Sequence, residues 1–257
     1  MDSYTGFAYL YDMFMDNIPY KKWYAYLKEL LLKYNINDGI ILDLGCGTGT
    51  ITKMLAGDGY DMIGVDNSEE MLQVAMEKSA DGEQNILYLL QDMREFELYG
   101  TVAAIISICD SMNYITEYKD LVQVFRLANN YLDPGGLFIF DMTTAAKYKS
   151  IGNSVITDNR DEGSFIWENT YYDDKKINQY DLTIFARIDE ETNLYERYDE
   201  THIQRVYEID EVKCALLEAG MEFVNVYDAF TYNAPTSESE RLYFIAREKR
   251  VKGKHYI

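Results

Sequence analysis

Two hydrophobic patterns alternate along the first half of the chain. Short apolar runs, the pattern of strands buried on both faces, occupy residues 39–44, 60–66, 85–92, 101–108 and 137–141. Before and between them, apolar side chains recur at helical spacing in residues 20–34, 48–57, 67–80 and 121–132. Strands that alternate with helices predict right-handed βαβ units and a parallel sheet. Asn67 is expected to cap the third of these helices, with Glu70 as its capping-box partner.

The pattern changes after the fifth apolar run. Residues 180–188 alternate strictly between apolar and polar side chains, and residues 164–172 and 194–207 also have the composition of strands. This pattern predicts an antiparallel meander with one solvated face. A helix over 210–220, capped by Asp210, and strands near 222–228 and 241–246 are expected to follow.

These elements predict an α/β fold with a mostly parallel seven-stranded sheet flanked by helices and an antiparallel β insert after strand five. We expect an N-terminal helical segment at residues 1–38. Residues 39–144 and 209–250 are expected to form the core, and residues 145–208 the insert.

Composition narrows the class of protein. The 257 residues carry a net charge of −20, which disfavours RNA or DNA as a partner, although the tail "REKRVKGKHYI" is basic. No apolar run approaches about 18 residues and no signal-peptide pattern is present, so we expect a protein without a membrane span. Three widely spaced cysteines indicate a reducing cytoplasm without disulfides. No His, Cys and carboxylate cluster has metal-ligand spacing, so we predict a reaction without a metal.

The stretch "ILDLGCGTGT", residues 41–50, carries the strongest chemical signal. Gly45, Gly47 and Gly49 follow a strand and precede a helix, where backbone freedom and free helix N–H groups favour a bound ligand. The spacing is G-x-G-x-G, whereas dinucleotide sites use G-x-G-x-x-G, and the G-K-[ST] of a P-loop is absent. The motif therefore argues against NAD and nucleoside triphosphates.

Acids follow at the ends of the next two strands. Asp66 lies roughly 20 residues beyond the glycine loop, where a carboxylate can accept from two ribose hydroxyls. Its alternative role is to cap the helix that follows. Asp92, in "QDMREF", could accept from an adenine amino group, and the Met93 N–H could reach a ring nitrogen. The glycine loop, Asp66 and Asp92 follow three successive strands, and together they indicate a nucleoside site more specifically than any one of them does.

These motifs resemble a known family. "ILDLGCGTGT", "GVDNSEEML", "QDMREF" and "LDPGGLFIFD" look like the nucleotide-binding motifs of class I S-adenosylmethionine-dependent methyltransferases, whose fold is Rossmann-like. "YDMFM", "ICDSMNYI" and the insert resemble small-molecule members, including bacterial deoxysugar N,N-dimethyltransferases and uncharacterised firmicute relatives. Where the sugar enzymes tend to carry a histidine in S-x-G-H, this chain reads Ser111-Met112-Asn113-Tyr114. The resemblance therefore does not fix the acceptor.

The resemblance implies a cofactor, S-adenosyl-L-methionine, and a methyl transfer to nitrogen or oxygen of a small molecule. It implies an N-terminal lid and a substrate cover formed by the insert. The expected cofactor contacts are Tyr11 in the lid, Asp43, Gly45, Cys46, Gly47, Gly49, Asp66, Asn67, Gln91, Asp92, Met93 and Cys109. RNA or protein methylation, and a regulatory protein that binds the cofactor without turnover, are the alternatives. A monomer or a homodimer is expected.

Catalytic candidates follow from position. Asp110 and Tyr114 lie just after strand four, and Asp141 ends strand five, where it could also cap the next turn. His202 in the insert is either a half-exposed strand residue or a base. If the insert folds over the pocket, it would present His202, Arg205 or Tyr207 to the substrate.

Overall fold

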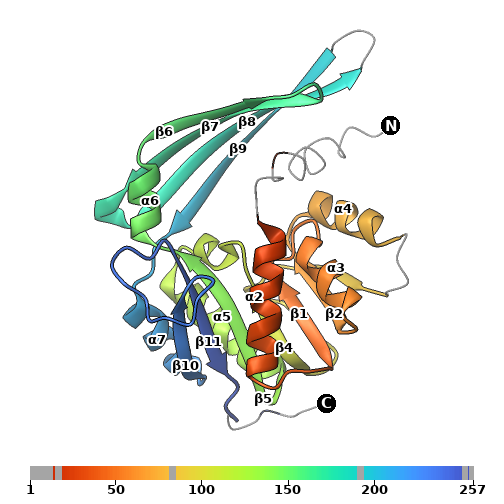
Figure 1. Ribbon diagram of the computed structural model, residues 1–257, viewed down its shortest axis with the longest axis vertical. Coiled ribbons are helices and arrows are strands. Elements are labelled where there is room, and N and C mark those ends of the chain that lie inside the picture. Colours follow the sequence, from red (N-terminus) through yellow and green to blue (C-terminus); the bar gives the residue numbers. More distant parts are fainter. Residues whose placement is uncertain (1–13, 15–18, 81–84, 190–193, 251–253, 255–257) are drawn as a thin grey trace.

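The computed structural model describes residue 14 and residues 19–80, 85–189, 194–250 and 254. Two sheets organise the chain (Figure 1), and the larger has seven strands in the order β10-β11-β5-β4-β1-β2-β3. Its strands are β1 (Ile40–Leu44), β2 (Asp61–Asp66), β3 (Leu87–Leu90), β4 (Val102–Ser107), β5 (Leu132–Thr143), β10 (Glu222–Asp228) and β11 (Arg241–Arg247). β1 to β5 are parallel, and β11 pairs antiparallel with both β5 and β10. The predicted α/β class is confirmed.

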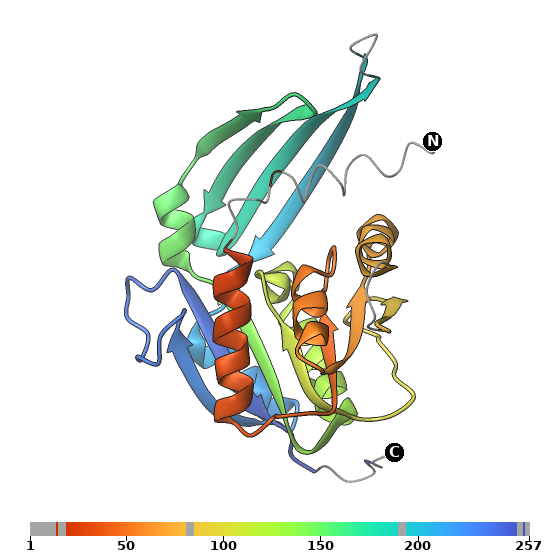
Figure 2. The same ribbon diagram turned by 45° about the vertical axis from the view of Figure 1, so that its right-hand side comes forward.

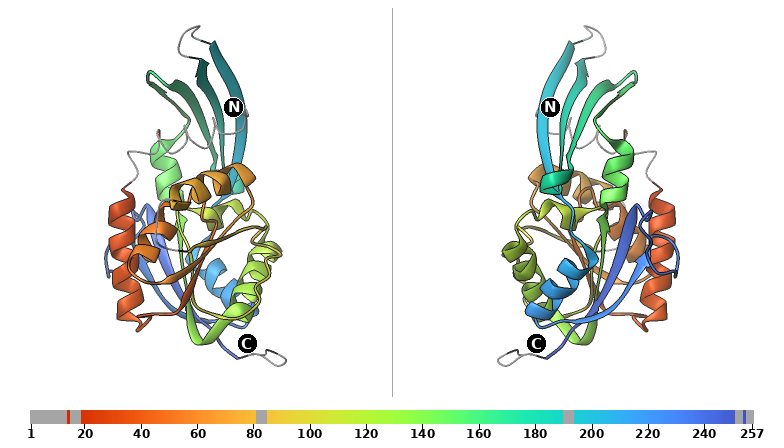
Figure 3. Two further views of the ribbon diagram at one scale, coloured as in Figure 1. Left: turned by 90° about the vertical axis from the view of Figure 1, so that its right-hand side faces the viewer. Right: turned by 90° about the vertical axis from the view of Figure 1, so that its left-hand side faces the viewer.

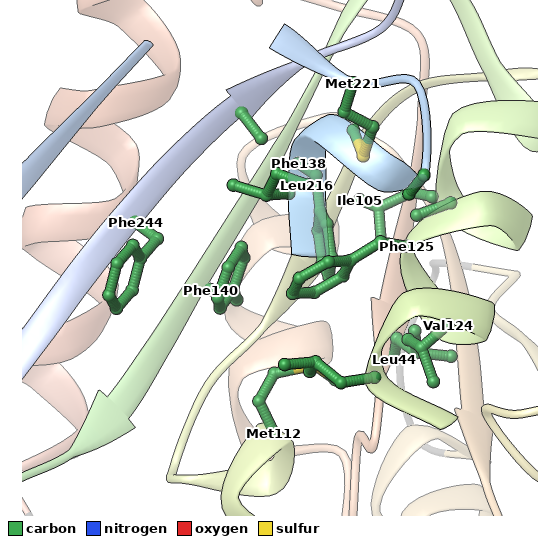
Figure 4. Close-up of a cluster of buried hydrophobic side chains, with 14 of the residues drawn as sticks. Leu44, Ile105, Met112, Val124, Phe125, Phe138, Phe140, Leu216, Met221 and Phe244 are labelled. Atoms are coloured by element: carbon green, nitrogen blue, oxygen red, sulfur yellow. The ribbon is translucent and has the colours of Figure 1, made fainter. Parts of the chain in front are cut away.

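Helices cover both faces of this sheet. α2 (Tyr20–Lys33) and α3 (Thr50–Gly57) pack on one face, α5 (Tyr118–Tyr131) and α7 (Ile209–Glu218) pack on the other, and α4 (Glu69–Ala80) joins β2 to β3. Figure 4 shows the second face, where Phe125 of α5 meets Phe138 and Phe140 of β5. The Phe140 ring stacks on Phe244 of β11 at 5.2 Å between centroids. Burial of these large rings fixes the helices on the sheet.

α2 is part of the core. Its buried side chains Trp23, Tyr26, Leu27, Leu30 and Leu31 belong to the same cluster as Ile41 of β1 and Ile139 of β5. This helix therefore completes a layer of the fold, and residues 1–13 and 15–18 of the predicted N-terminal lid, including Tyr11, lie outside the described residues.

The insert is a separate four-stranded antiparallel sheet. Its strands are β6 (Ser154–Asn159), β7 (Gly163–Tyr172), β8 (Ile177–Asp189) and β9 (Leu194–Arg205), preceded by α6 (Ala145–Ile151), with the 3-10 turn η3 (Asp173–Lys175) between β7 and β8. Figures 2 and 3 show this sheet standing over the end of the core where the parallel strands finish. The alternation of 180–188 holds for buried Ile184 and Ala186, but Ile188 is 60% exposed beyond a register shift.

Two elements were not predicted from the sequence, and two predicted strands differ in detail. α6 has seven residues and β6 is an edge strand without apolar alternation, so neither gave a periodic signal. β3 is expected to be covered on both faces, yet it is the edge of the sheet, and Leu87 and Leu90 are 49% and 55% exposed. The fifth strand begins at Leu132, directly after α5 ends.

Two helix caps lie one or two residues away from the predicted positions. Ser68, rather than Asn67, caps α4, because its Oγ accepts from the Met71 N–H. Glu208, rather than Asp210, caps α7 in a capping box with Glu211.

Among the helices that the structure describes, none combines the length and the apolar character that a membrane span requires.

Candidate active site

The glycine loop is packed on one side and open on the other. Gly49 has φ = 70°, and a Cβ there would lie 2.6 Å from the Tyr88 hydroxyl and 2.9 Å from Ala75 Cβ. Gly47 has φ = 54°, but a Cβ there would meet no atom within 4 Å. Lys78 of α4 holds the loop from outside by donating to the Thr48 carbonyl at 3.1 Å. The open side at Gly47 is where a ligand can approach the backbone closely.

Asp66 links this loop to the start of α4. Its Oδ2 accepts from the Gly47 N–H at 2.7 Å, and its Oδ1 accepts from the Ser68 N–H at 3.0 Å. Burial raises the pKa of Asp66, and these backbone donors oppose the rise. Both predicted roles are thus compatible, because each carboxylate oxygen can accept a second hydrogen bond from a hydroxyl. Asn67 lies exposed beside it.

The other predicted cofactor residues lie around the same strand ends. Asp92 is paired with Arg94, whose Nε lies 2.9 Å from Oδ1, so a bound adenine would have to share this carboxylate. Gln91 Oε1 accepts from the Glu97 N–H at 2.7 Å and shapes the turn. The end of the Met93 side chain borders Gly45, and the Cys46 thiol borders Gly64.

Asp43 lies under the loop and is fully buried. It accepts a hydrogen bond from Thr52 Oγ1 at 2.6 Å, which ties β1 to α3. Burial raises the pKa of Asp43 from 3.8 to about 7, the Thr52 hydrogen bond opposes the rise, and the charge of Asp66 adds to it.

Asp43→Asn is expected to change how stability depends on pH. Between pH 3.8 and about 7 the folded protein keeps a proton on Asp43 that the unfolded chain releases, so this residue lowers the free energy of unfolding by about 1.4 kcal/mol per pH unit as pH rises. Asparagine keeps an acceptor for Thr52 and does not titrate. In urea unfolding without cofactor, the free energy of unfolding of the variant should therefore rise relative to that of the wild type from pH 5 to pH 7.5. A constant difference between the two proteins would refute the assignment.

Strand four ends in two strained residues. Cys109 and Asp110 both have left-handed backbones, with φ of 61° and 56°. Their N–H groups donate to the buried Asp141 carboxylate, at 3.3 Å and 2.7 Å. Asp141 therefore holds this turn, and the helix after β5 is capped by Thr144 instead, so its predicted role in capping is wrong.

Arg241 of β11 forms ion pairs with both acids at this turn, Asp110 and Asp141. Its guanidinium lies 2.8 Å from Asp141 Oδ2 and 2.8 Å from Asp110 Oδ1, and 5.2 Å from the Trp23 ring centroid. Burial would lower the pKa of Arg241, but Asp141 and Asp110 hold it well above its ordinary value. Gln204 Nε2 donates to the second oxygen of Asp110 at 2.7 Å. Asp110, predicted as a catalytic group, is thus hydrogen-bonded on both oxygens.

A second cluster joins the core to the insert. Tyr114, in the 3-10 turn η2 (Ser111–Tyr114), has its hydroxyl 3.2 Å from His202 Nδ1 and hydrogen-bonded to the Tyr180 hydroxyl. His202 Nε2 lies 2.8 Å from Glu200 Oε2. The structure therefore brings together two of the predicted catalytic residues, Tyr114 and His202, which are 88 positions apart.

Arg205 and Tyr207 connect the insert to the core. Arg205 donates to the Thr116 carbonyl at 2.9 Å and pairs with Glu211, and Tyr207 donates to the Ile115 carbonyl at 2.6 Å. Both side chains are engaged with the segment after η2.

Sequence reasoning missed Glu200, Arg241, Gln204 and Asn113. Asn113 is fully buried and joins three segments, because it donates to the carbonyls of Thr143 and Arg205 and accepts from the Thr143 N–H. Glu200 had a signal, since it is two residues from His202 on a predicted strand and therefore on the same face. The others depend on contacts between distant segments.

Comparison with known proteins gives a consistent picture. A methyltransferase-domain family matches residues 41–136. A protein of Geobacillus sp. (strain WCH70) named "putative methyltransferase" is 36% identical over 96% of this chain and 100% of its own length. A crystal structure of an S-adenosylmethionine-dependent methyltransferase from Clostridium acetobutylicum is 28% identical, with a TM-score of 0.83 over 96% of this chain and 99% of that one. The sugar N-methyltransferase KedS8 from Streptoalloteichus sp. shares the fold, with a TM-score of 0.76 at 16% identity over 93% of each chain.

Proposed function

Because the chain belongs to the S-adenosylmethionine-dependent methyltransferases, we propose that it transfers the methyl group to nitrogen or oxygen of a small molecule. S-Adenosylmethionine is the cofactor of this family, and when bound it supplies a methyl group carried on a positively charged sulfur. The proposal beyond the family concerns the acceptor and the residues that serve each partner.

The glycine loop supports the assignment of the cofactor side. The backbone at Gly47 faces open space, which a larger side chain would fill. The Gly47 N–H donates a hydrogen bond to Asp66. We propose that Gly45, Gly47 and Gly49 line the methionine part and that Asp66 holds the ribose hydroxyls. Asn67, Gln91, Asp92 and Met93 would surround the adenine, while Asp43, Cys46 and Cys109 would border the loop and the sulfur.

The contact between η2 and the insert is the observation that carries the acceptor assignment. Tyr114 is 40% exposed in η2, its hydroxyl meets Tyr180 and His202 of the insert, and Glu200 in turn contacts His202. Such a group of proton donors and acceptors suits an amine or hydroxyl that must lose a proton before attack. KedS8, which shares the fold, is named a sugar N-methyltransferase, and an amino sugar would be an acceptor of this kind.

We propose the following domain roles on this basis. Residues 145–208 cover the substrate, residues 39–144 and 209–250 hold the cofactor, and a lid that includes Tyr11 lies within residues 1–38. The net charge of −20 argues for a small acceptor over RNA.

A screen with methyl-labelled cofactor tests the acceptor class. We expect label transfer to amines, amino sugars or hydroxylated metabolites, identified by mass spectrometry. Transfer only to RNA or to a protein, or no transfer despite tight cofactor binding, would overturn the small-molecule assignment.

Asp66→Ala is expected to weaken the binding of S-adenosylhomocysteine by 10- to 100-fold. The ribose would lose its acceptor and the Gly47 N–H its partner, which together are worth about 1.4–2.7 kcal/mol of binding free energy. Isothermal calorimetry measures the change. Glu69→Ala, an exposed acid three residues further on, serves as the control and should bind as the wild type does. Equal affinities for Asp66→Ala and wild type would remove the ribose assignment.

A further inference from the structure

We propose that Tyr114, His202 and Glu200 form a proton relay that accepts the proton of the methyl acceptor, with Glu200 as a positioning residue that fixes the tautomer of His202. The inference rests on the proposed function and makes it more specific. It assigns the acceptor to molecules that present an ionisable hydroxyl or ammonium group to Tyr114.

The hydrogen bonds of His202 determine which nitrogen carries the proton. Glu200 Oε2 lies 2.8 Å from Nε2, and a carboxylate can only accept, so Nε2 must carry the hydrogen. In the neutral ring Nδ1 is then a lone-pair acceptor. The Tyr114 hydroxyl, 3.2 Å away, must donate to it.

The same reasoning assigns the hydrogen bond between the two tyrosines. Because the Tyr114 hydrogen is committed to His202, the Tyr180 hydroxyl is the donor and Tyr114 Oη the acceptor. Tyr180 can then stabilise negative charge on Tyr114. Its own ring is held between Trp167, at 4.8 Å, and His202, stacked at 4.6 Å. Three strands of the insert thus fix the geometry of the relay.

The proton balance of the relay is simple. The acceptor gives its proton to Tyr114 Oη, and Tyr114 gives its own to His202 Nδ1. The imidazolium that results shares its Nε2 hydrogen with Glu200. The electron pair left on the acceptor oxygen or nitrogen forms the new bond to the methyl carbon, and the pair of the broken C–S bond stays on sulfur as a neutral thioether.

The charges around His202 favour this sequence. Glu200 of β9 is the acid in contact with the ring, and Tyr114 of η2 and Tyr180 of β8 are the other titratable groups that face it. Asp110, on the core side, is paired with Arg241 and accepts a hydrogen bond from Gln204. A protonated His202 would therefore share its Nε2 hydrogen with the Glu200 carboxylate, as in the Ser-His-Asp arrangement of hydrolases.

Nuclear magnetic resonance of the imidazole tests the relay without any acceptor. The chain has two histidines, so a His255→Gln background leaves the His202 ring as the one signal from 15N-histidine label. In the full-length protein saturated with S-adenosylhomocysteine, we expect the Nε2–H tautomer to dominate, with Nδ1 unprotonated. A dominant Nδ1–H tautomer would overturn the proposal.

Two variants separate positioning from simple packing. Glu200→Ala should mix the two tautomers, whereas Tyr114→Phe should keep the Nε2–H tautomer and shift the Nδ1 resonance. Glu196→Ala is the matched control, since Glu196 lies on the same face of β9 and accepts from Tyr198 at 2.7 Å. Identical His202 spectra for Glu200→Ala and Glu196→Ala would refute the role of Glu200.

Kinetics with the acceptor found in the screen tests the use of the relay. His202→Gln should lower kcat on the order of 10²-fold, and Glu200→Ala by a smaller factor, with calorimetric affinity for S-adenosylhomocysteine within twofold of wild type. Unchanged kcat in both variants would remove the relay from catalysis while leaving the methyltransferase proposal intact. If the screen detects no small molecule that accepts the methyl group, the proposed function is refuted instead, and the tautomer result still holds.

Discussion

Arg241→Met is expected to lower the free energy of unfolding by about 3–5 kcal/mol at pH 8. Arg241 is the cation that the structure pairs with Asp141, whose side chain is completely buried. Methionine fills similar volume but removes the charge, so it leaves Asp141 ionised in a buried site and Asp110 without its ion-pair partner. Urea unfolding followed by circular dichroism measures the loss.

The loss should depend on pH in one direction. Burial raises the pKa of Asp141, and Arg241 opposes the rise. Without Arg241 the folded-state pKa rises further above the unfolded value, so the folded protein takes up a proton as pH falls and recovers stability. The variant should therefore approach the wild type at pH 5.5.

A double variant and a control complete this experiment. Asp141→Asn combined with Arg241→Met should recover the part of the loss at pH 8 that comes from Asp141 and remove the pH dependence that Asp141 causes, while Asp110 keeps its hydrogen bond from Gln204. Arg247→Met, at the other end of β11, removes an arginine without an ion pair among the described residues and should cost less than about 1 kcal/mol. Equal losses in the two arginine variants would refute the assignment of Arg241.

The glycine loop and the core strands could be predicted because their signals are local. Strand, glycines and helix lie within residues 41–57, and the alternation of apolar runs and helices reports burial directly. The sheet edge could not be read in the same way. β3 has an apolar sequence, but its exposure follows from its place at the end of the strand order, since no described strand lies beyond it.

The corner around Arg241 could not be predicted for a related reason. Arg241 and Asp110 are 131 positions apart and meet because β11 returns antiparallel beside β5. Nothing in the local sequence of either residue specifies that pairing. Asp141 was therefore interpreted as a possible base, whereas its contacts to Cys109 and Asp110 show that it supports the backbone.

Tyr114 and His202 could each be predicted as catalytic candidates from the sequence, but their contact could not be predicted. Tyr114 was predicted from its place after strand four and His202 from its place in the insert. The way the insert folds back over the core decides that they touch, and this depends on Asn113, which binds both Thr143 and Arg205. The structure of the glycine loop was thus more predictable than the contact between η2 and the insert.

Gly49→Ala is expected to destabilise the protein by about 2–4 kcal/mol. Alanine in a left-handed conformation costs about 1–2 kcal/mol, and its Cβ would lie 2.6 Å from the Tyr88 hydroxyl and 2.9 Å from Ala75. Because Tyr88 and Ala75 belong to β3 and α4, the overlap would push apart the elements that hold Asp66. The thermal midpoint should fall by several degrees, as measured by differential scanning calorimetry.

Gly47→Ala provides the matched control because it shares the strain and lacks the overlap. Its Cβ meets nothing within 4 Å, so we expect a loss of only about 1–2 kcal/mol in stability. Its methyl group would instead project into the space proposed for the cofactor, and the affinity for S-adenosylhomocysteine should fall at least tenfold. The two variants therefore separate the two functions of the loop, and the reverse order of stability losses would contradict the packing described.

A double variant tests the cause of the Gly49 effect. Tyr88→Phe removes the hydroxyl that the new Cβ would meet, together with its 3.0 Å hydrogen bond to Ser79. If the overlap with the hydroxyl dominates, adding Gly49→Ala to Tyr88→Phe should cost at least 1 kcal/mol less than adding it to the wild type. Additive losses would mean that backbone strain and Ala75 account for the cost. Losses that are not additive would assign the requirement for glycine at position 49 to its packing against β3, whereas the requirement at position 47 is expected to come from the cofactor.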